Sequence, residues 1–208
     1  MLTLEGLSGG AIAGIVCGIV FGLILIIAIV LVGWYIKKAN YLRRMQVKIK
    51  ESASDIDVAL TKRFDLLTKQ YDITKGYAKH ENDTLIDVAK MRSNYHEASS
   101  NTADASANMK DLSKFNAEMD KMSKSINIVV ERYPELKANT MFINLSNTCA
   151  DVEEHLQAAR RLYNSNVSIY NQEIVVFPSS IVANHIHATP IDFFEAEEAK
   201  RQDVKMEF

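Results

Sequence analysis

The chain has 208 residues, 48% of them apolar, and its 24 Lys and Arg nearly balance its 26 Asp and Glu. This length and composition can support one or two small domains with an apolar core, and they are not typical of a disordered or strongly charged chain. Seven of the 8 glycines lie at or before Gly33, and their scarcity afterwards excludes turn-rich β-sandwiches and barrels as well as glycine-rich phosphate-binding loops.

The first predicted element is an uncharged apolar segment at residues 11–36. At about 1.5 Å per residue, the segment is longer than the hydrocarbon layer of a bilayer is thick, about 30 Å, so it can span a membrane with some tilt. The preceding residues 1–10 contain no Lys or Arg, whereas a cleaved signal peptide begins with a basic region. The pattern therefore predicts a retained transmembrane helix in a single-pass membrane protein.

Six basic residues follow the predicted span before the next acidic residue, Glu51. Basic residues next to a span favour the cytoplasmic side, so residues 1–10 are predicted to lie outside and the large C-terminal part in the cytoplasm. We expect the juxtamembrane segment 37–50 to contact anionic lipid headgroups, with Trp34 at the membrane interface. The basic residues of this segment are Lys37, Lys38, Arg43, Arg44, Lys48 and Lys50.

Four glycines recur at every fourth position of the span: Gly10, Gly14, Gly18 and Gly22. This spacing places them on one helix face, where small residues let a second transmembrane helix approach closely. The sequence thus predicts a packing face for self-association or for another membrane protein. The alternative is that these glycines are simply tolerated, as glycine generally is in membrane helices.

Past the span, apolar or small side chains recur at intervals of three and four residues, which predicts one long amphipathic helix. We expect this helix to leave the membrane without a hinge and, despite Gly76, to have a pattern that can continue through residues 85–95. Its predicted buried face comprises Leu42, Met45, Ile49, Ser52, Ile56, Leu60, Phe64, Leu67, Tyr71, Thr74 and Ala78.

Residues 99–108 contain no large apolar side chain and are expected to form a reversal of the chain or a frayed helix end. A second amphipathic helix follows and ends before Pro134, because proline disfavours the helical conformation in the preceding residue. Its predicted buried face comprises Leu112, Phe115, Met119, Met122, Ile126, Val129 and Tyr133.

A third amphipathic helix is predicted after a turn at residues 134–139, with Asn139 or Thr140 as its N-cap and Pro178 closing it. Its predicted buried face comprises Phe142, Leu145, Cys149, Val152, Leu156, Ala159, Tyr163, Asn166, Tyr170, Ile174 and Phe177. The tail at 179–208 mixes apolar pairs with an acidic cluster, Glu195, Glu197 and Glu198, and part of it is expected to pack back as a short fourth helix.

These elements predict an all-α protein with one N-terminal transmembrane helix and an antiparallel bundle of three long helices. Amphipathic helices joined by short reversals bury their apolar stripes against one another through knobs-into-holes contacts of the coiled-coil kind. We assign residues 51–178 to the bundle domain and residues 179–208 to a tail on or near it.

No residue is predicted to be catalytic or to bind a metal or a cofactor. Asp151 and His155 lie one helical turn apart, but two ligands do not complete a tetrahedral metal site, so a solvated contact is preferred. His185 and His187 are interpreted as loop histidines. Cys149 falls in the apolar period and is expected to be a buried thiol rather than a nucleophile. An enzyme or metal protein that uses the face of Asp151 and His155 is kept as an alternative.

Two pairs of adjacent basic residues, Lys62–Arg63 and Arg160–Arg161, could bind phosphate. On long helices such pairs more often face solvent or meet carboxylates, here Glu153 and Glu154. Nucleic-acid binding is disfavoured because residues 51–208 carry 25 acidic and 18 basic side chains, which would repel a polyanion.

Nine short segments, in this order, resemble the LemA family of small membrane-anchored bacterial proteins. They are Ser54–Leu60, Lys62–Asp65, Lys75–Glu81, Tyr133–Asn139, Ala158–Asn164, Tyr170–Asn171, Phe177–Ser179, Phe193–Glu198 and Val204–Phe208. The chain departs from the family pattern at Leu67–Gln70, where the family has a proline and an asparagine, and this change implies a straighter helix. It departs again at Asn184–His187, where the family has a glycine and a phenylalanine.

The resemblance implies a one-span anchor followed by a helical bundle in the bacterial plasma membrane, with no established catalytic activity. Family members are linked with a membrane protease of the HtpX type, which makes such a protease a candidate partner, and relatives occur in magnetosome membranes. Some relatives are exported, which leaves an extracytoplasmic bundle open.

Two functional hypotheses follow, besides the enzyme alternative. In the first, the protein is a non-enzymatic scaffold or adaptor that holds its bundle at the membrane for protein–protein interaction. In the second, it is a membrane sensor or signal transmitter whose continuous first helix couples the span to the bundle. The first is preferred because 10 residues outside the membrane offer little to bind a ligand.

Overall fold

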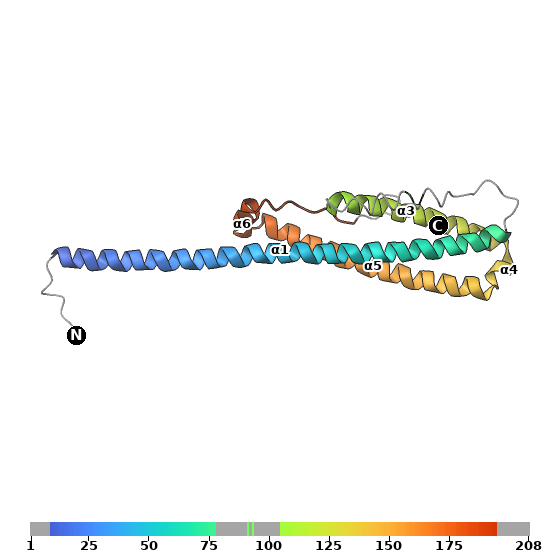
Figure 1. Ribbon diagram of the computed structural model, residues 1–208, viewed down its shortest axis with the longest axis horizontal. Coiled ribbons are helices and arrows are strands. Elements are labelled where there is room, and N and C mark those ends of the chain that lie inside the picture. The colour runs from blue at the N-terminus through green and yellow to red at the C-terminus, as the bar shows by residue number, and fades with distance from the viewer. Residues whose placement is uncertain (1–8, 78–90, 92, 94–104, 195–208) are drawn as a thin grey trace, which may run out of the picture. The chain divides into compact units, whose positions relative to one another are not determined.

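The computed structural model describes residues 9–77, 91, 93 and 105–194, and every element within these ranges is a helix (Figure 1). The elements are α1 (Gly9–Tyr77), α3 (Ala105–Arg132), α4 (Pro134–Lys137), α5 (Thr140–Val175) and α6 (Ser179–His185). The prediction of an all-α protein is confirmed. The chain forms two compact units, the first at residues 1–44 and 173–189 and the second at residues 45–172 and 190–208.

The N-terminal part of α1 is a candidate membrane-spanning helix. It is long and apolar enough to cross a bilayer, with a mean hydropathy of 3.4 in its most apolar window. Its large apolar side chains between Ile15 and Val32 are 48% to 68% exposed. Each Å² of apolar surface left in water costs about 25 cal/mol, so an apolar surrounding such as lipid is favourable for a helix exposed to this extent.

The second unit is built around the stretch of α1 that begins at Met45. Nearly all the residues predicted for the buried face of this stretch are buried, and the rings of Phe64 and Phe115 lie 5.4 Å apart, centroid to centroid. α3, α4 and α5 contribute most of the rest of the core. The largest fully buried side chains of this unit are Tyr163, Tyr170, Ile49, Ile56, Leu60, Met109, Leu112, Met119, Met122, Leu136 and Leu156.

α5 runs antiparallel to the two other long helices of the bundle, and α3 runs in the same direction as α1 (Figure 1). This direction of α3 corrects one detail of the predicted bundle, in which a reversal at residues 99–108 made neighbouring helices antiparallel. Between α1 and α3 the structure describes only Met91 and Ser93, both helical, so most of the predicted continuation of the first helix through residues 85–95 lies outside the described residues.

The junction between α3 and α5 contains a short helix where a turn was expected. α3 ends at Arg132 and α4 begins at Pro134. Leu136 of α4 is fully buried. Asn139 is the N-cap of α5, as predicted, because its Oδ1 accepts hydrogen bonds from the backbone N–H groups of Met141 (2.9 Å) and Phe142 (3.2 Å).

Beyond α5, the chain forms the short α6 and then an extended segment that returns to the bundle. Two asparagines seven residues apart on α5, Asn171 and Asn164, each exchange two hydrogen bonds with the backbone of one residue, Ile191 and Phe194 respectively. Seven helical residues rise about 10.5 Å, which three extended residues also span. Because the two lengths match, both asparagines can bind the segment at once, and their four hydrogen bonds hold residues 191–194 along α5.

Two predicted core positions, one after α5 and one in α3, are not buried as expected. Phe177 was placed on the buried face of the third helix, but α5 ends at Val175 and Phe177 is 77% exposed. Val130 rather than Val129 is buried in α3, because the period takes a step of four after Ile126. The predicted boundaries of the anchor, bundle and tail stay predictions, and the acidic cluster from Glu195 lies outside the described residues.

Candidate functional site

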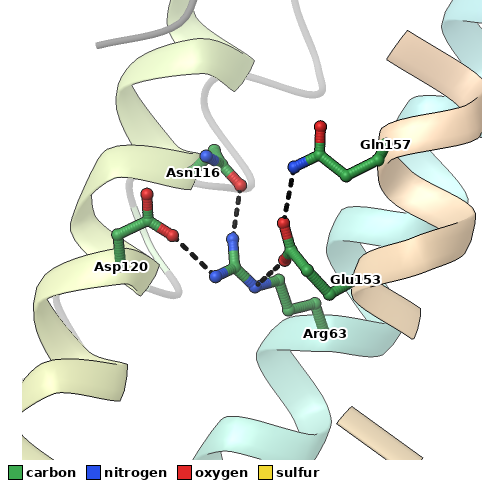
Figure 2. A network of polar contacts seen from close by, with 5 residues as sticks. All are labelled: Arg63, Asn116, Asp120, Glu153 and Gln157. Carbon is green, nitrogen blue, oxygen red and sulfur yellow. Dashed lines mark hydrogen bonds and ion pairs between the residues drawn. The ribbon is translucent and has the colours of Figure 1, made fainter. Parts of the chain in front are cut away.

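A buried arginine joins the three long helices of the bundle. Arg63 on α1 is only 8% exposed. Its Nη1 donates to Asn116 Oδ1 at 2.5 Å and its Nη2 to Asp120 Oδ1 at 2.6 Å, both on α3 (Figure 2). Its Nε lies 3.1 Å from Glu153 Oε2 on α5, and Gln157 Nε2 donates to the other oxygen of Glu153 at 2.8 Å.

This polar cluster of Arg63, Asn116, Asp120, Glu153 and Gln157 suits a structural role. A planar guanidinium with donors on three nitrogens can bind three acceptors at once, which fixes the relative register of the helices that supply them. Its charge is offset by two carboxylates, and this satisfies the requirement that a buried charge be paired. Periodicity had favoured a solvated position for the pair Lys62–Arg63, with carboxylates such as Glu153 as alternative partners, and Arg63 follows that alternative.

Cys149, which was expected to be a buried thiol rather than a nucleophile, lies beside this cluster. It lines a hollow of about 240 Å³ together with Arg63, Gln70 and Ser146, and its side chain is half-buried. Burial raises the pKa of its thiol, and the charge of Arg63 offsets this only in part. A thiol with a raised pKa is protonated near neutral pH, so it has the character of a core residue and not of an activated nucleophile.

The residues considered for metal binding are not brought together. Asp151 and His155 are both exposed on α5. Within the residues that the structure describes, no group of three or more His, Cys, Asp or Glu side chains is arranged to hold a metal ion. His185 instead forms a hydrogen bond between its Nδ1 and the hydroxyl of Tyr35 at 2.7 Å.

A shallow groove of about 490 Å³ runs between α1 and α5 in the second unit. Its lining includes the short side chains of Ala59 and Ala159. Two large apolar residues flank it and stay exposed, Val58 (64%) and Leu162 (52%). The residues that line this groove are Asp55, Val58, Ala59, Lys62, Val152, His155, Ala158, Ala159 and Leu162.

In the first unit, the four glycines of the predicted packing face lie on an open surface. Beyond the adjoining backbone of α1, a Cβ atom placed on any of them would meet no atom of the described residues within 4 Å. The face is therefore free to receive another helix, although no contact in this single chain tests that prediction. The glycines are Gly10, Gly14, Gly18 and Gly22.

Of the six residues predicted to bind lipid headgroups, one forms an ion pair within the chain and five are exposed. Lys38 pairs with Glu173 at the end of α5, at 2.5 Å, and its ammonium lies 5.1 Å from the centre of the Tyr41 ring. The hydrogen bond from Lys38 lowers the pKa of Glu173, helped by one from Ser179. The remaining basic residues are exposed, namely Lys37, Arg43, Arg44, Lys48 and Lys50.

Two comparisons identify known proteins that this chain resembles. The family model described as the LemA family matches residues 52–208. A relative named Protein LemA, from Metamycoplasma hominis, is 28% identical over 170 residues, which cover 82% of this chain and 74% of the relative. The match includes the helices that carry the polar cluster and the groove.

Proposed function

Since this chain belongs to the LemA family, and its apolar N-terminal helix continues directly into the bundle, we propose that it is a membrane-anchored scaffold. In this role the protein acts by protein–protein contact and performs no catalysis of its own. The observation that carries the proposal is the 69-residue α1, a single helix that contains both an exposed apolar stretch and residues of the bundle core. A bundle built on such a helix is tethered to the bilayer by its own core.

The membrane in this proposal is the bacterial plasma membrane, with the N-terminus outside and the bundle in the cytoplasm. The basic residues after the span support this orientation, and five of them are exposed and available to anionic headgroups. The open glycine face supports a partner within the membrane, either a second copy of the chain or another membrane protein such as a protease of the HtpX type.

The groove is the proposed docking surface for a partner outside the membrane. The alanines in its lining let a helix approach closely, and Val58 on α1 and Leu162 on α5 offer exposed apolar contact. Asp55 and Lys62 add charges of opposite sign on the α1 side, two helical turns apart. These features fit an amphipathic helix of the partner that carries both a basic and an acidic residue.

A crosslinking experiment tests this proposal. A photo-crosslinking amino acid is placed at Val58, at Leu162 or, as a matched control, at Ile128, which is similarly exposed (49%) but lies on α3. In native membranes, we expect the two groove positions to capture the same protein and the control position to capture none. Equal capture from all three positions, or capture from neither groove position, would contradict a docking role for the groove.

The unbroken α1 also supports the second candidate function, a signal transmitter. The exposed residues Asn40 and Tyr41 allow a test, because replacing both by glycine weakens the helix without removing a buried side chain. In a transmitter, this double variant changes the groove crosslinks relative to a double alanine control. In a scaffold, the crosslinks of the two variants are the same.

A further inference from the structure

An apolar surface surrounds the turn between α5 and α6 in the first unit. Its members are between 56% and 77% exposed, and we call them the apolar turn: Val175, Val176, Phe177 and Ile181. The other face of α6 is buried through Ser179, Val182 and Ala183. The apolar turn is thus the outward side of an ordered element and not an unfolded end.

Leaving these four side chains in water is unfavourable. Fully burying one such side chain contributes about 1.5–3 kcal/mol, and contiguous exposed apolar patches mark contact surfaces. The sequence from residue 174 to residue 189 contains no acidic side chain that would keep this region away from an anionic surface. The nearest acidic residue, Glu173, is already paired with Lys38.

The position of the apolar turn along α1 is fixed by two contacts within the same unit. Tyr35 and His185 share a hydrogen bond of 2.7 Å, and their rings pack edge to face with centroids 5.6 Å apart. Lys38 binds Glu173, whose Oε2 also accepts a hydrogen bond from Ser179 Oγ at 3.1 Å. α6 consequently lies beside the turn of α1 at residues 35–38 (Figure 1).

This turn of α1 is where the apolar run ends and the basic segment begins. In a helix that spans a bilayer, such a transition lies at the level of the headgroups, where tyrosine and lysine are favoured. Any element packed on Tyr35 and Lys38 is held at that level too.

We propose that the apolar turn inserts into the interfacial layer of the membrane, so that the protein holds the bilayer at two points, its span and this turn. The inference rests on the membrane anchor of the proposed function and adds a second lipid contact to it. The occupant is a lipid surface because the contacts of Tyr35 and Lys38 hold the patch beside the end of the apolar span. Exposed basic residues, including Lys37 and Arg43, also lie in the same unit.

Tryptophan fluorescence in vesicles tests the inference on the full chain. Trp34 is the only tryptophan and is first replaced by phenylalanine. Phe177→Trp then gives one reporter in the apolar turn, and Ile128→Trp gives a matched control on the bundle. The vesicles contain phosphatidylcholine and phosphatidylglycerol, with or without brominated acyl chains.

We expect brominated lipid to quench most of the emission of the Phe177→Trp variant, and aqueous acrylamide to quench little of it. The Ile128→Trp control should show the opposite pattern. Acrylamide quenching of both variants would overturn the inference, as would protection of the Phe177→Trp variant from both quenchers, because a second copy would then cover the turn.

Alkaline carbonate extraction separates this inference from the anchor on which it rests. A chain that is retained in the vesicles while its Phe177→Trp reporter stays open to acrylamide refutes only the second contact. A chain that is released by carbonate refutes the anchor itself, and with it the insertion of the apolar turn. Because Phe177 is exposed, we expect the substitution to leave the helix content unchanged, which circular dichroism checks.

Discussion

At the scale of single residues, Arg63 has the greatest predicted effect on stability. Arg63→Ala would leave Asp120 and Glu153 without their shared cation, and breaking a buried ion pair by removing one partner costs about 3–5 kcal/mol. Urea unfolding of the full chain in detergent, followed by circular dichroism, measures this loss. Lys62→Ala is the control, because its side chain is exposed one position away, and equal midpoints for the two variants would contradict the role of Arg63.

Glu173 should make stability depend on pH. Its pKa is lowered in the folded chain, so its contribution is fully present above the ordinary pKa of a glutamate and is lost as the pH falls through the lowered value. We expect Glu173→Gln to lower the thermal midpoint at neutral pH and to match the original chain in acid. A difference that stays constant with pH, or that also appears for the exposed Glu154→Gln, would contradict this assignment.

At the scale of elements, the sequence periodicity correctly predicted the buried positions of helices where the buried side chains are apolar. Leu42, Ile56 and Leu60 follow the three-four pattern and are fully buried, since a helix that packs on neighbours must repeat its apolar contacts every turn. The same pattern cannot reveal a buried Arg63 or Asn116, whose burial depends on partners supplied by other helices. The pattern also could not predict the direction in which α3 runs, because amphipathicity shows which face of a helix is buried and not which way the helix points.

The paired asparagines of α5 give a prediction for the segment at residues 191–194. Asn164→Ala removes two hydrogen bonds to the backbone of Phe194, each worth about 0.5–1.5 kcal/mol. We expect faster hydrogen exchange at the amide of Phe194, which mass spectrometry or NMR can follow. The exposed Asn147→Ala on the same helix should leave this exchange unchanged, and an equal rate in both variants would show that other contacts hold the segment.

At the scale of the whole molecule, the glycine face offers a way to separate association in the membrane from folding. Apart from the adjoining backbone of α1, no atom of the described residues lies within 4 Å of a Cβ placed on Gly14 or Gly18, so Gly14→Leu with Gly18→Leu should not disturb the fold of these residues. Two leucines on this face would prevent the close approach that a small-xxx-small contact needs. We therefore expect the double variant, in native membranes, to lose most of the chemical crosslinks that join this chain to other membrane proteins or to a second copy of itself.

Gly33→Leu is the matched control for this prediction. Gly33 is equally open, since a Cβ placed on it also meets no atom within 4 Å, but it lies outside the four-residue repeat of the face. Replacing glycine by leucine favours the helix in all these variants, so a loss of crosslinks confined to the double variant cannot come from unfolding of α1. If the double variant and Gly33→Leu retain the same crosslinks, partners meet this protein through another surface, and the groove between α1 and α5 becomes the next surface to test.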